Sequence, residues 1–131
     1  MKVLLNEQLP VKLKFRFDTR YNVTTGRDMQ WLGIKDQQLF LKLKENNFNA
    51  FLTNDQNFKF QLNSNKLTFS FINVNFYSNR YEDLITLIPG LNDALAILKE
   101  TLLSASNEVN KIYVLTNGKL MDWVNLNNRI R

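Results

Sequence analysis

The sequence predicts an α/β domain in which a central, mainly parallel β-sheet carries helices on its faces. Short continuous apolar runs, typical of strands buried on both faces, alternate with longer segments whose apolar residues have helical spacing. Over the first half of the chain the order is strand, helix, strand, helix, strand, which is the order of parallel sheets with helical crossovers. Near the C-terminus, an Asn-Gly pair between two apolar runs predicts a β-hairpin.

The opening of the chain is predicted to form a strand and then a helix. Val3–Leu5 is a continuous apolar run that stops at polar Asn6, as expected for a buried strand that opens onto a loop. Pro10 suits the first turn of the helix that follows, because the N–H that proline lacks would have no helical partner there. The apolar residues of this helix have helical spacing and are Leu9, Leu13 and Phe17.

The next three segments are predicted to be a strand, a short helical turn and a helix. Tyr21–Thr25 is rich in β-branched residues and is followed by a glycine, which favours a strand. Arg27–Trp31 is expected to form a helical turn before Gly33. Asp36 suits the N-cap of the helix, because its carboxylate can accept hydrogen bonds from the first unpaired N–H groups. The apolar residues expected on one face of this helix are Leu39, Phe40 and Leu43.

Two further strands and a long helical segment follow. Ala50–Thr53 is a short apolar run, and Leu67–Val74 is another in which the apolar residues mostly alternate. Tyr81–Leu103 has helical spacing along its whole length. Pro89 interrupts it, so we expect either a kink at this point or the start of a second helix.

The C-terminal part is predicted to be a hairpin within the same domain. Residues 112–115 and 120–124 are apolar arms on either side of the Asn-Gly pair. No repeat, low-complexity linker or domain boundary is visible. Residues 1–131 are therefore expected to form a single domain, which is also the number of cores that a chain of this length can bury.

The residue inventory excludes several kinds of chemistry. The chain has no cysteine and no histidine, so disulfides, thiolate metal sites, serine–histidine triads and histidine-based ribonuclease chemistry are excluded. An enzyme of this composition has to use carboxylates, lysine, tyrosine or a carboxylate-bound cation such as Mg²⁺. No apolar run is long enough for a membrane helix, and an acid and a proline follow the start too soon for a signal peptide. We expect a cytoplasmic protein with no membrane contact.

The charge balance favours an anionic partner. The 17 lysines and arginines outnumber the 12 acids, which gives a formal net charge of +5. RNA is one such partner, and the candidate RNA-binding residues are Lys12, Arg16 and Arg27, with Lys14 and Arg20 close to them in the sequence. A solvated helix surface is the simpler interpretation of these charges. An ion pair between Arg27 and Asp28 is a further alternative.

Polar residues follow two of the predicted strands, where ligands bind in open α/β sheets. Asn6 and Glu7 follow the first strand, and Asp55 follows the third. Asp36 and Gln37–Gln38, at the start of the middle helix, can reach the same edge. Because Mg²⁺ prefers oxygen ligands, the candidate metal ligands are the acids Asp55, Glu7 and Asp36. The structural alternatives are a helix cap for Asp36 and a turn residue for Asp55.

Three segments, MKVLLNEQLP, RDMQWLG followed by IKDQQL, and FLTNDQNFKFQ, resemble the DUF5615 group of PIN-like proteins. The resemblance lies in their order and spacing and covers roughly residues 1–100. It implies a three-layer, Rossmann-like α/β fold and a Mg²⁺- or Mn²⁺-dependent endoribonuclease site, since the group is related to PIN-domain ribonucleases. It also implies a toxin role in a toxin–antitoxin pair, with an antitoxin protein and RNA as partners and a homodimer as a common assembly.

Carried over position by position, the resemblance implies that the catalytic residues are Asn6, Gln38 and Asp55, with Gln37 as the alternative to Gln38. Of these three residues only Asp55 is an acid. The group has Asp at the position of Asn6 and often Glu at that of Gln38, so amides stand in this chain where the group has acids. An amide can offer an oxygen to a cation, but it brings no negative charge and cannot act as a base. The chain is rich in asparagine, so drift in base composition is one explanation of the amides, and deliberate silencing is another.

Two hypotheses for the function follow. In the first, the chain is a metal-dependent endoribonuclease in which Asp55, with Glu7 or Asp36, holds the cation, and metal-activated water attacks an RNA phosphodiester. In the second, it is a catalytically inactive PIN-like module that keeps the fold and binds a protein partner or RNA. The resemblance favours the first hypothesis, and the two amides favour the second.

Overall fold

The computed structural model describes residues 1–55, 68–103, 112–116 and 119–122. Within these residues six strands form one sheet in the order β2-β1-β3-β4-β5-β6. Each neighbouring pair from β2 to β5 is parallel, and β6 is antiparallel to β5. The strands are β1 (Lys2–Leu5), β2 (Asn22–Thr25), β3 (Ala50–Thr53), β4 (Ser70–Asn73), β5 (Ile112–Thr116) and β6 (Lys119–Asp122).

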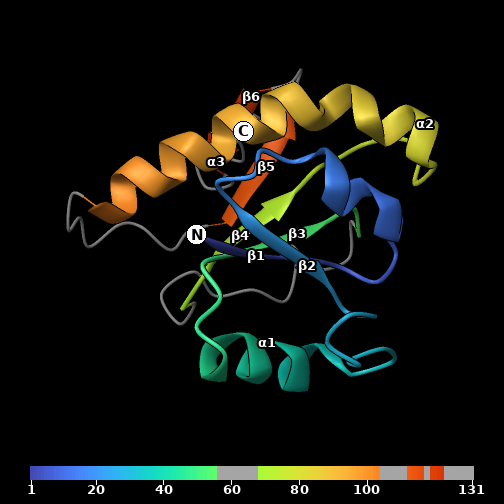
Figure 1. Ribbon diagram of the computed structural model, residues 1–131, viewed down its shortest axis with the longest axis vertical. Helices are drawn as coiled ribbons and strands as arrows, with labels where there is room; N and C mark the ends of the chain where they lie inside the picture. Colours follow the sequence, from blue (N-terminus) through green and yellow to red (C-terminus); the bar gives the residue numbers. More distant parts are fainter. Residues whose placement is uncertain (56–67, 104–111, 117–118, 123–131) are drawn as a thin grey trace, which may run out of the picture.

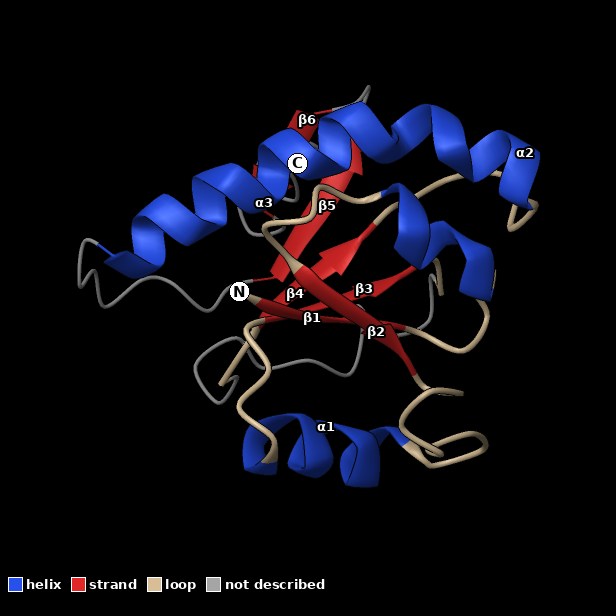
Figure 2. Ribbon diagram, in the orientation of Figure 1, coloured by secondary structure: helices blue, strands red, loops and turns tan. Residues whose placement is uncertain are grey.

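Helices cover both faces of the sheet, as Figures 1 and 2 show. Among the described residues, one face carries a single helix, α1 (Asp36–Glu45). The elements on the opposite face are η1 (Val11–Arg16), α2 (Tyr81–Leu84), η4 (Ile85–Leu87) and α3 (Ile88–Leu103). The predicted α/β class is therefore confirmed. Within the described part of the chain, no helix has the length and apolar character that crossing a membrane requires.

Two buried clusters hold the helices to the sheet. Leu4, Phe51 and Phe71 are aligned across β1, β3 and β4 and pack with Leu39 and Leu43 of α1. Because side chains alternate along a strand, the neighbouring residues belong to the other face. This second cluster contains Leu5, Leu52, Ile72, Leu91, Leu95 and Leu98. Burial on both faces explains why the strands are continuous apolar runs rather than alternating ones.

The predicted strands at residues 3–5, 21–25 and 50–53 are confirmed, and the first two differ from the prediction by one residue at their start. The strand predicted from Leu67 is shorter and begins at Ser70, and residue 67 itself lies outside the described residues. At Pro89 the second of the two alternatives is correct, because α3 begins at Ile88. Proline in a first helical turn removes an N–H that has no intrahelical partner there.

Two local predictions were wrong, and one was right in part. The helix after Pro10 is a six-residue 3₁₀ helix, in which the N–H of Leu13 bonds to the carbonyl oxygen of Pro10. The helical turn predicted from Arg27 is a run of hydrogen-bonded turns, one of them from the N–H of Met29 to the carbonyl oxygen of Thr25, but Gln30 has a φ of 61°, outside helical values. Asp36 is the first residue of α1 and not its cap, because Lys35 occupies the N-cap position with no side-chain capping bond.

The C-terminal strands β5 and β6 pair from Tyr113–Asp122 to Thr116–Lys119. The Asn-Gly pair at residues 117–118, on which the predicted hairpin turn depends, lies outside the described residues. Residues 123–124 of the predicted second arm also lie outside them.

Candidate functional site

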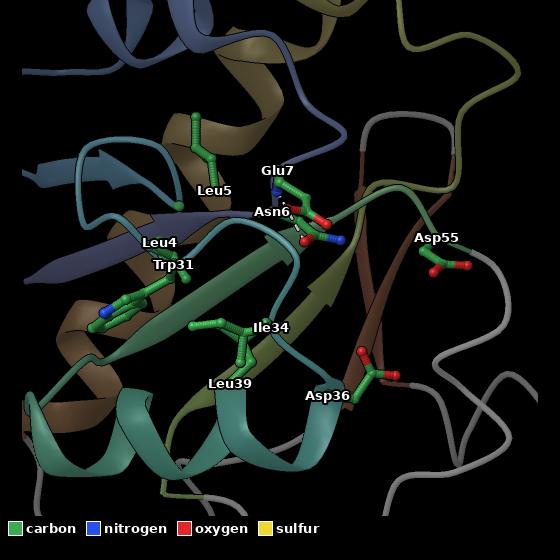
Figure 3. A pocket seen from close by; sticks show the side chains of 10 residues that line it. Leu4, Leu5, Asn6, Glu7, Trp31, Ile34, Asp36, Leu39 and Asp55 are labelled. Carbon is green, nitrogen blue, oxygen red and sulfur yellow. Dashed lines mark hydrogen bonds between the residues drawn. The ribbon is translucent and has the colours of Figure 1, made fainter.

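A pocket lies at the carboxyl ends of β1 and β3, on the side of the sheet that α1 covers (Figure 3). Its volume is about 100 Å³. A space of this size holds a few water molecules or a hydrated ion, but it is well below the ~300–1,000 Å³ of pockets for drug-sized ligands. The residues that line it are Leu4, Leu5, Asn6, Glu7, Gly26, Trp31, Ile34, Asp36, Leu39 and Asp55.

Two carboxylates face each other across this pocket. Asp36 comes from the first residue of α1, and Asp55 comes from the loop directly after β3. Figure 3 shows both side chains directed toward the same opening. Burial, and then the negative charge of Asp55, raises the pKa of Asp36 above the ordinary value of an aspartate. The like charge of Asp55 thus acts on Asp36 in addition to burial.

Both the oxygen and the nitrogen of the Asn6 side-chain amide are hydrogen-bonded within the protein. Its Oδ1 accepts a hydrogen bond from the N–H of Glu7 at 2.9 Å. Its Nδ2 donates to Oγ1 of Thr53 at 2.8 Å and to Oε1 of Gln8 at 3.1 Å. An ionised aspartate at this position could not donate either of the last two bonds. The amide is thus part of the scaffold that joins β1 to β3.

Glu7 lines the pocket, but its carboxylate already has a partner in the protein. Its Oε2 accepts a hydrogen bond from the N–H of Gly33 at 2.9 Å. Gly33 has a φ of +75°, which glycine adopts without strain. Glu7 therefore fastens the loop between β2 and α1, which contributes Trp31 and Ile34 to the pocket.

Gln8 is the residue of the site that the sequence analysis missed. Its Oε1 accepts hydrogen bonds from Oγ1 of Thr53 at 2.6 Å, from the N–H of Asn54 at 2.8 Å and from Asn6. Its position just after a strand was a usable signal. Its partners, which are 45 and 46 residues away along the chain, could not be recognised without the fold.

The backbone of Asp55 is held on both sides by buried polar side chains. The N–H of Asp55 donates to Oγ1 of Thr53 at 3.1 Å, and its carbonyl oxygen accepts from Nδ2 of Asn73 at 3.1 Å. Thr53 is 0% exposed and Asn73 is 2% exposed. The ends of β3 and β4 therefore fix the backbone from which the Asp55 carboxylate extends into the pocket.

Gln38 lies apart from this pocket. It is exposed, as is Gln37, and neither residue lines the cavity. Successive residues of an α-helix are rotated by about 100°, so Asp36 and Gln38 lie on nearly opposite sides of α1. The structure thus brings together Asn6, Glu7, Asp36 and Asp55, but it does not bring Gln38 to them.

The predicted RNA-binding cations also lie outside the pocket lining, which contains none of Lys12, Arg16 and Arg27. The Nε of Arg16 donates to the hydroxyl of Tyr81 at 2.6 Å. Asp28 pairs with Lys14, at 2.7 Å between Nζ and Oδ2, so the predicted pair between Arg27 and Asp28 was wrong.

Comparisons with protein-family models, with curated proteins and with solved structures found no match to this chain. The chemistry of the site is therefore inferred from its own residues. Within the described residues, no three acids are grouped closely enough to form a metal-binding cluster. The oxygen ligands that the pocket offers are the carboxylates of Asp36 and Asp55. Beside them lie the amide of Asn6 and the carboxylate of Glu7, which are already hydrogen-bonded to the protein.

Proposed function

We propose that this chain is a PIN-like module that binds RNA through a divalent cation, and that its pocket has too little negative charge for efficient cleavage. The proposal joins the sequence resemblance to the facing pair Asp36 and Asp55. Mg²⁺ in proteins is commonly held by one or two carboxylates together with phosphate oxygens and water. The two aspartates fit this donor set, and a cation held by them would bind an RNA phosphate electrostatically.

The observation that carries the proposal is that residue 6 is an uncharged asparagine whose side chain is hydrogen-bonded within the protein. Its amide brings no charge, and the amide hydrogens bond to Thr53 and Gln8. A nuclease of the kind implied by the resemblance needs an acid at this point, because metal-assisted hydrolysis depends on charge that lowers the pKa of the attacking water. The pocket keeps the means of holding a cation while lacking one of the acids needed for hydrolysis.

A Mg²⁺-dependent endoribonuclease is the second candidate, and Glu7 favours it. Its carboxylate lines the same pocket and accepts a hydrogen bond from the backbone N–H of Gly33. Release of that bond would supply a third carboxylate. The toxin role, the antitoxin partner and the homodimer are predictions from the resemblance alone.

The test is the melting temperature with and without millimolar Mn²⁺, for the wild-type chain and for D36N, N6D and Q38E. A ligand that binds only the folded state raises its stability, so Mn²⁺ should stabilise the wild type but not D36N. N6D should gain more than the wild type. Q38E is the matched control, because it adds the same charge outside the pocket and should behave as the wild type does. No response to Mn²⁺ in the wild type or in N6D would refute the cation site.

Incubation with a labelled single-stranded RNA separates the two candidates. An RNA-binding module should retain the RNA uncut in Mn²⁺, whereas a nuclease should cut it. Cutting by the wild type that is lost in E7Q would support the second candidate and overturn the first. Cutting that persists in both E7Q and D36N would point to a contaminating nuclease.

A further inference from the structure

Tyr77 is the most exposed large apolar side chain in the described part of the chain. It is 83% exposed and lies in the loop between β4 and α2. Its ring packs against that of Phe76, with 4.4 Å between the centroids and 41° between the planes. The tyrosine ring thus contacts the protein at Phe76, while most of its surface is exposed to water.

The loop that carries Tyr77 is fixed in place by Asn54, the residue before Asp55. Oδ1 of Asn54 accepts from the N–H of Phe76 at 2.8 Å. Its Nδ2 donates to Oδ1 of Asn79 at 2.8 Å and to the carbonyl oxygen of Ser78 at 3.2 Å. These bonds hold the backbone on both sides of Tyr77, and Asn54 itself is 8% exposed. The exposed ring is therefore presented in a defined position beside the strand end that carries the pocket.

Polar residues flank Tyr77 along the loop. Asn75 and Asn79 are exposed on the same loop, and Arg80 follows them. The Arg80 side chain is 72% exposed, and its Nε lies 3.6 Å from Glu82 and 3.9 Å from Asp83. Pairs as exposed and as long as these are weak, so a phosphate can compete for the guanidinium.

This combination fits a nucleotide better than a protein partner. A protein hot spot is an aromatic residue in a pocket from which surrounding contacts exclude water. Tyr77 is instead 83% exposed, with one aromatic neighbour, Phe76, and polar residues at positions 75 and 78–80 of the loop. An unpaired nucleobase offers a flat face for stacking, edges that bond to amides, and a phosphate that bonds to arginine.

We propose that Tyr77 is a stacking platform for an unpaired base of single-stranded RNA bound beside the pocket. The inference deepens the proposed function and rests on it for the identity of the polymer. Base stacking on an aromatic side chain accounts for roughly 5- to 150-fold in the Kd per base. Loss of the ring should therefore weaken binding by a factor in this range.

The test is fluorescence anisotropy in Mn²⁺ with two probes, a short labelled oligouridine and an abasic ribose-phosphate oligomer of the same length. Y77A should weaken binding of oligouridine by the factor above and leave binding of the abasic oligomer unchanged. Y77F should bind as the wild type does, because it keeps the ring. F15A is the matched control, since Phe15 is 76% exposed, lies beside Lys14 and belongs to η1 instead of this loop. Equal melting temperatures of the variants would show that all of them are folded.

Three results would overturn the inference: unchanged binding of oligouridine in Y77A, an equal loss in F15A, or an equal loss of the abasic oligomer in Y77A. The proposed function fails separately, if RNA binding needs Tyr77 but is the same without Mn²⁺ and in D36N. Cation-dependent binding that is unaffected in Y77A would refute the stacking platform alone. Absence of RNA binding by the wild type under all these conditions would refute both.

Discussion

Asp36 and Asp55 come from different elements, a helix start and a strand end, and their carboxylates face each other across one pocket (Figure 3). Burial of Asp36, together with the charge of Asp55, raises the pKa of Asp36. Without a cation, ionisation of Asp36 therefore opposes folding. The fold thus retains an unfavourable interaction between like charges at a point where a bound cation would relieve it.

Asp36→Asn should raise the melting temperature at pH 7, because it removes a charge whose ionisation the folded state disfavours. A raised folded-state pKa means that the folded protein binds the proton more tightly than the unfolded chain does. The penalty in the wild type is therefore complete above the folded pKa and is lost as the pH falls to the unfolded value. The advantage of the variant, measured by thermal unfolding without divalent cations, should shrink over the same range.

Asp55→Asn serves as the partner in a double-mutant cycle. If the two charges repel each other, the stabilisation in D36N/D55N should be smaller than the sum of the two single effects. Additive effects would show that burial alone raises the pKa of Asp36, and that the two carboxylates are too far apart to share a cation.

Asn54→Ala should destabilise the protein by about 1–3 kcal/mol, because it leaves the N–H of Phe76 without its acceptor and removes two further bonds. Urea denaturation measures this loss. Asn54→Asp should lose less, since it keeps an acceptor for Phe76, while Asn22→Ala on an exposed strand position is the control. A loss in N54A no larger than in N22A would mean that the loop of Tyr77 is not fixed by Asn54.

The sequence predicted most of the sheet for a physical reason. Leu4 and Leu5 point to opposite faces, and both are buried because a helix layer covers each face. A continuous apolar run records this double burial. The 3₁₀ helix was missed because the spacing of Leu9, Leu13 and Phe17 suits an α-helix equally well. All three residues are buried as predicted, so the pattern reports burial and not the type of helix.

The site was predictable only where chemistry follows from position along a strand. Asn6 and Asp55 follow strand ends, and parallel strands bring such ends to one edge. Gln38 was placed by resemblance, but its position on α1 directs it away from Asp36. The partners of Gln8 and Asn54 depend on loops that meet only in the folded chain, and no local pattern records them.

Gly33→Ala should cost about 1–2 kcal/mol, because Gly33 has a φ of +75°, which residues with a Cβ adopt under strain. Gly26→Ala is the matched control on the same loop. A Cβ at Gly26 would meet Cβ of Glu7 and Cδ2 of Leu32 at 3.9 Å, which is ordinary contact. Urea denaturation of both variants tests this difference, and an equal loss in the two would contradict the backbone explanation.

Lys14→Met tests whether Lys14 serves the fold or the RNA. The hydrogen bond from Lys14 is the main cause that lowers the pKa of Asp28. The pair is partly exposed, so its loss should cost only about 0.2–1 kcal/mol at pH 7 and low salt. A lowered acid pKa stabilises the fold above the unfolded value, and this contribution is lost as the pH falls through the folded pKa. Thermal unfolding should therefore separate K14M from the wild type at pH 7 but not at strongly acidic pH or in high salt. Lys12→Met is the control on the same helix, because Lys12 is exposed and takes part in no ion pair within the described residues.

If K12M weakens RNA binding in the anisotropy assay and K14M does not, Lys14 is structural. A loss of RNA binding in K14M equal to that in K12M would show that its bond to Asp28 gives way to phosphate.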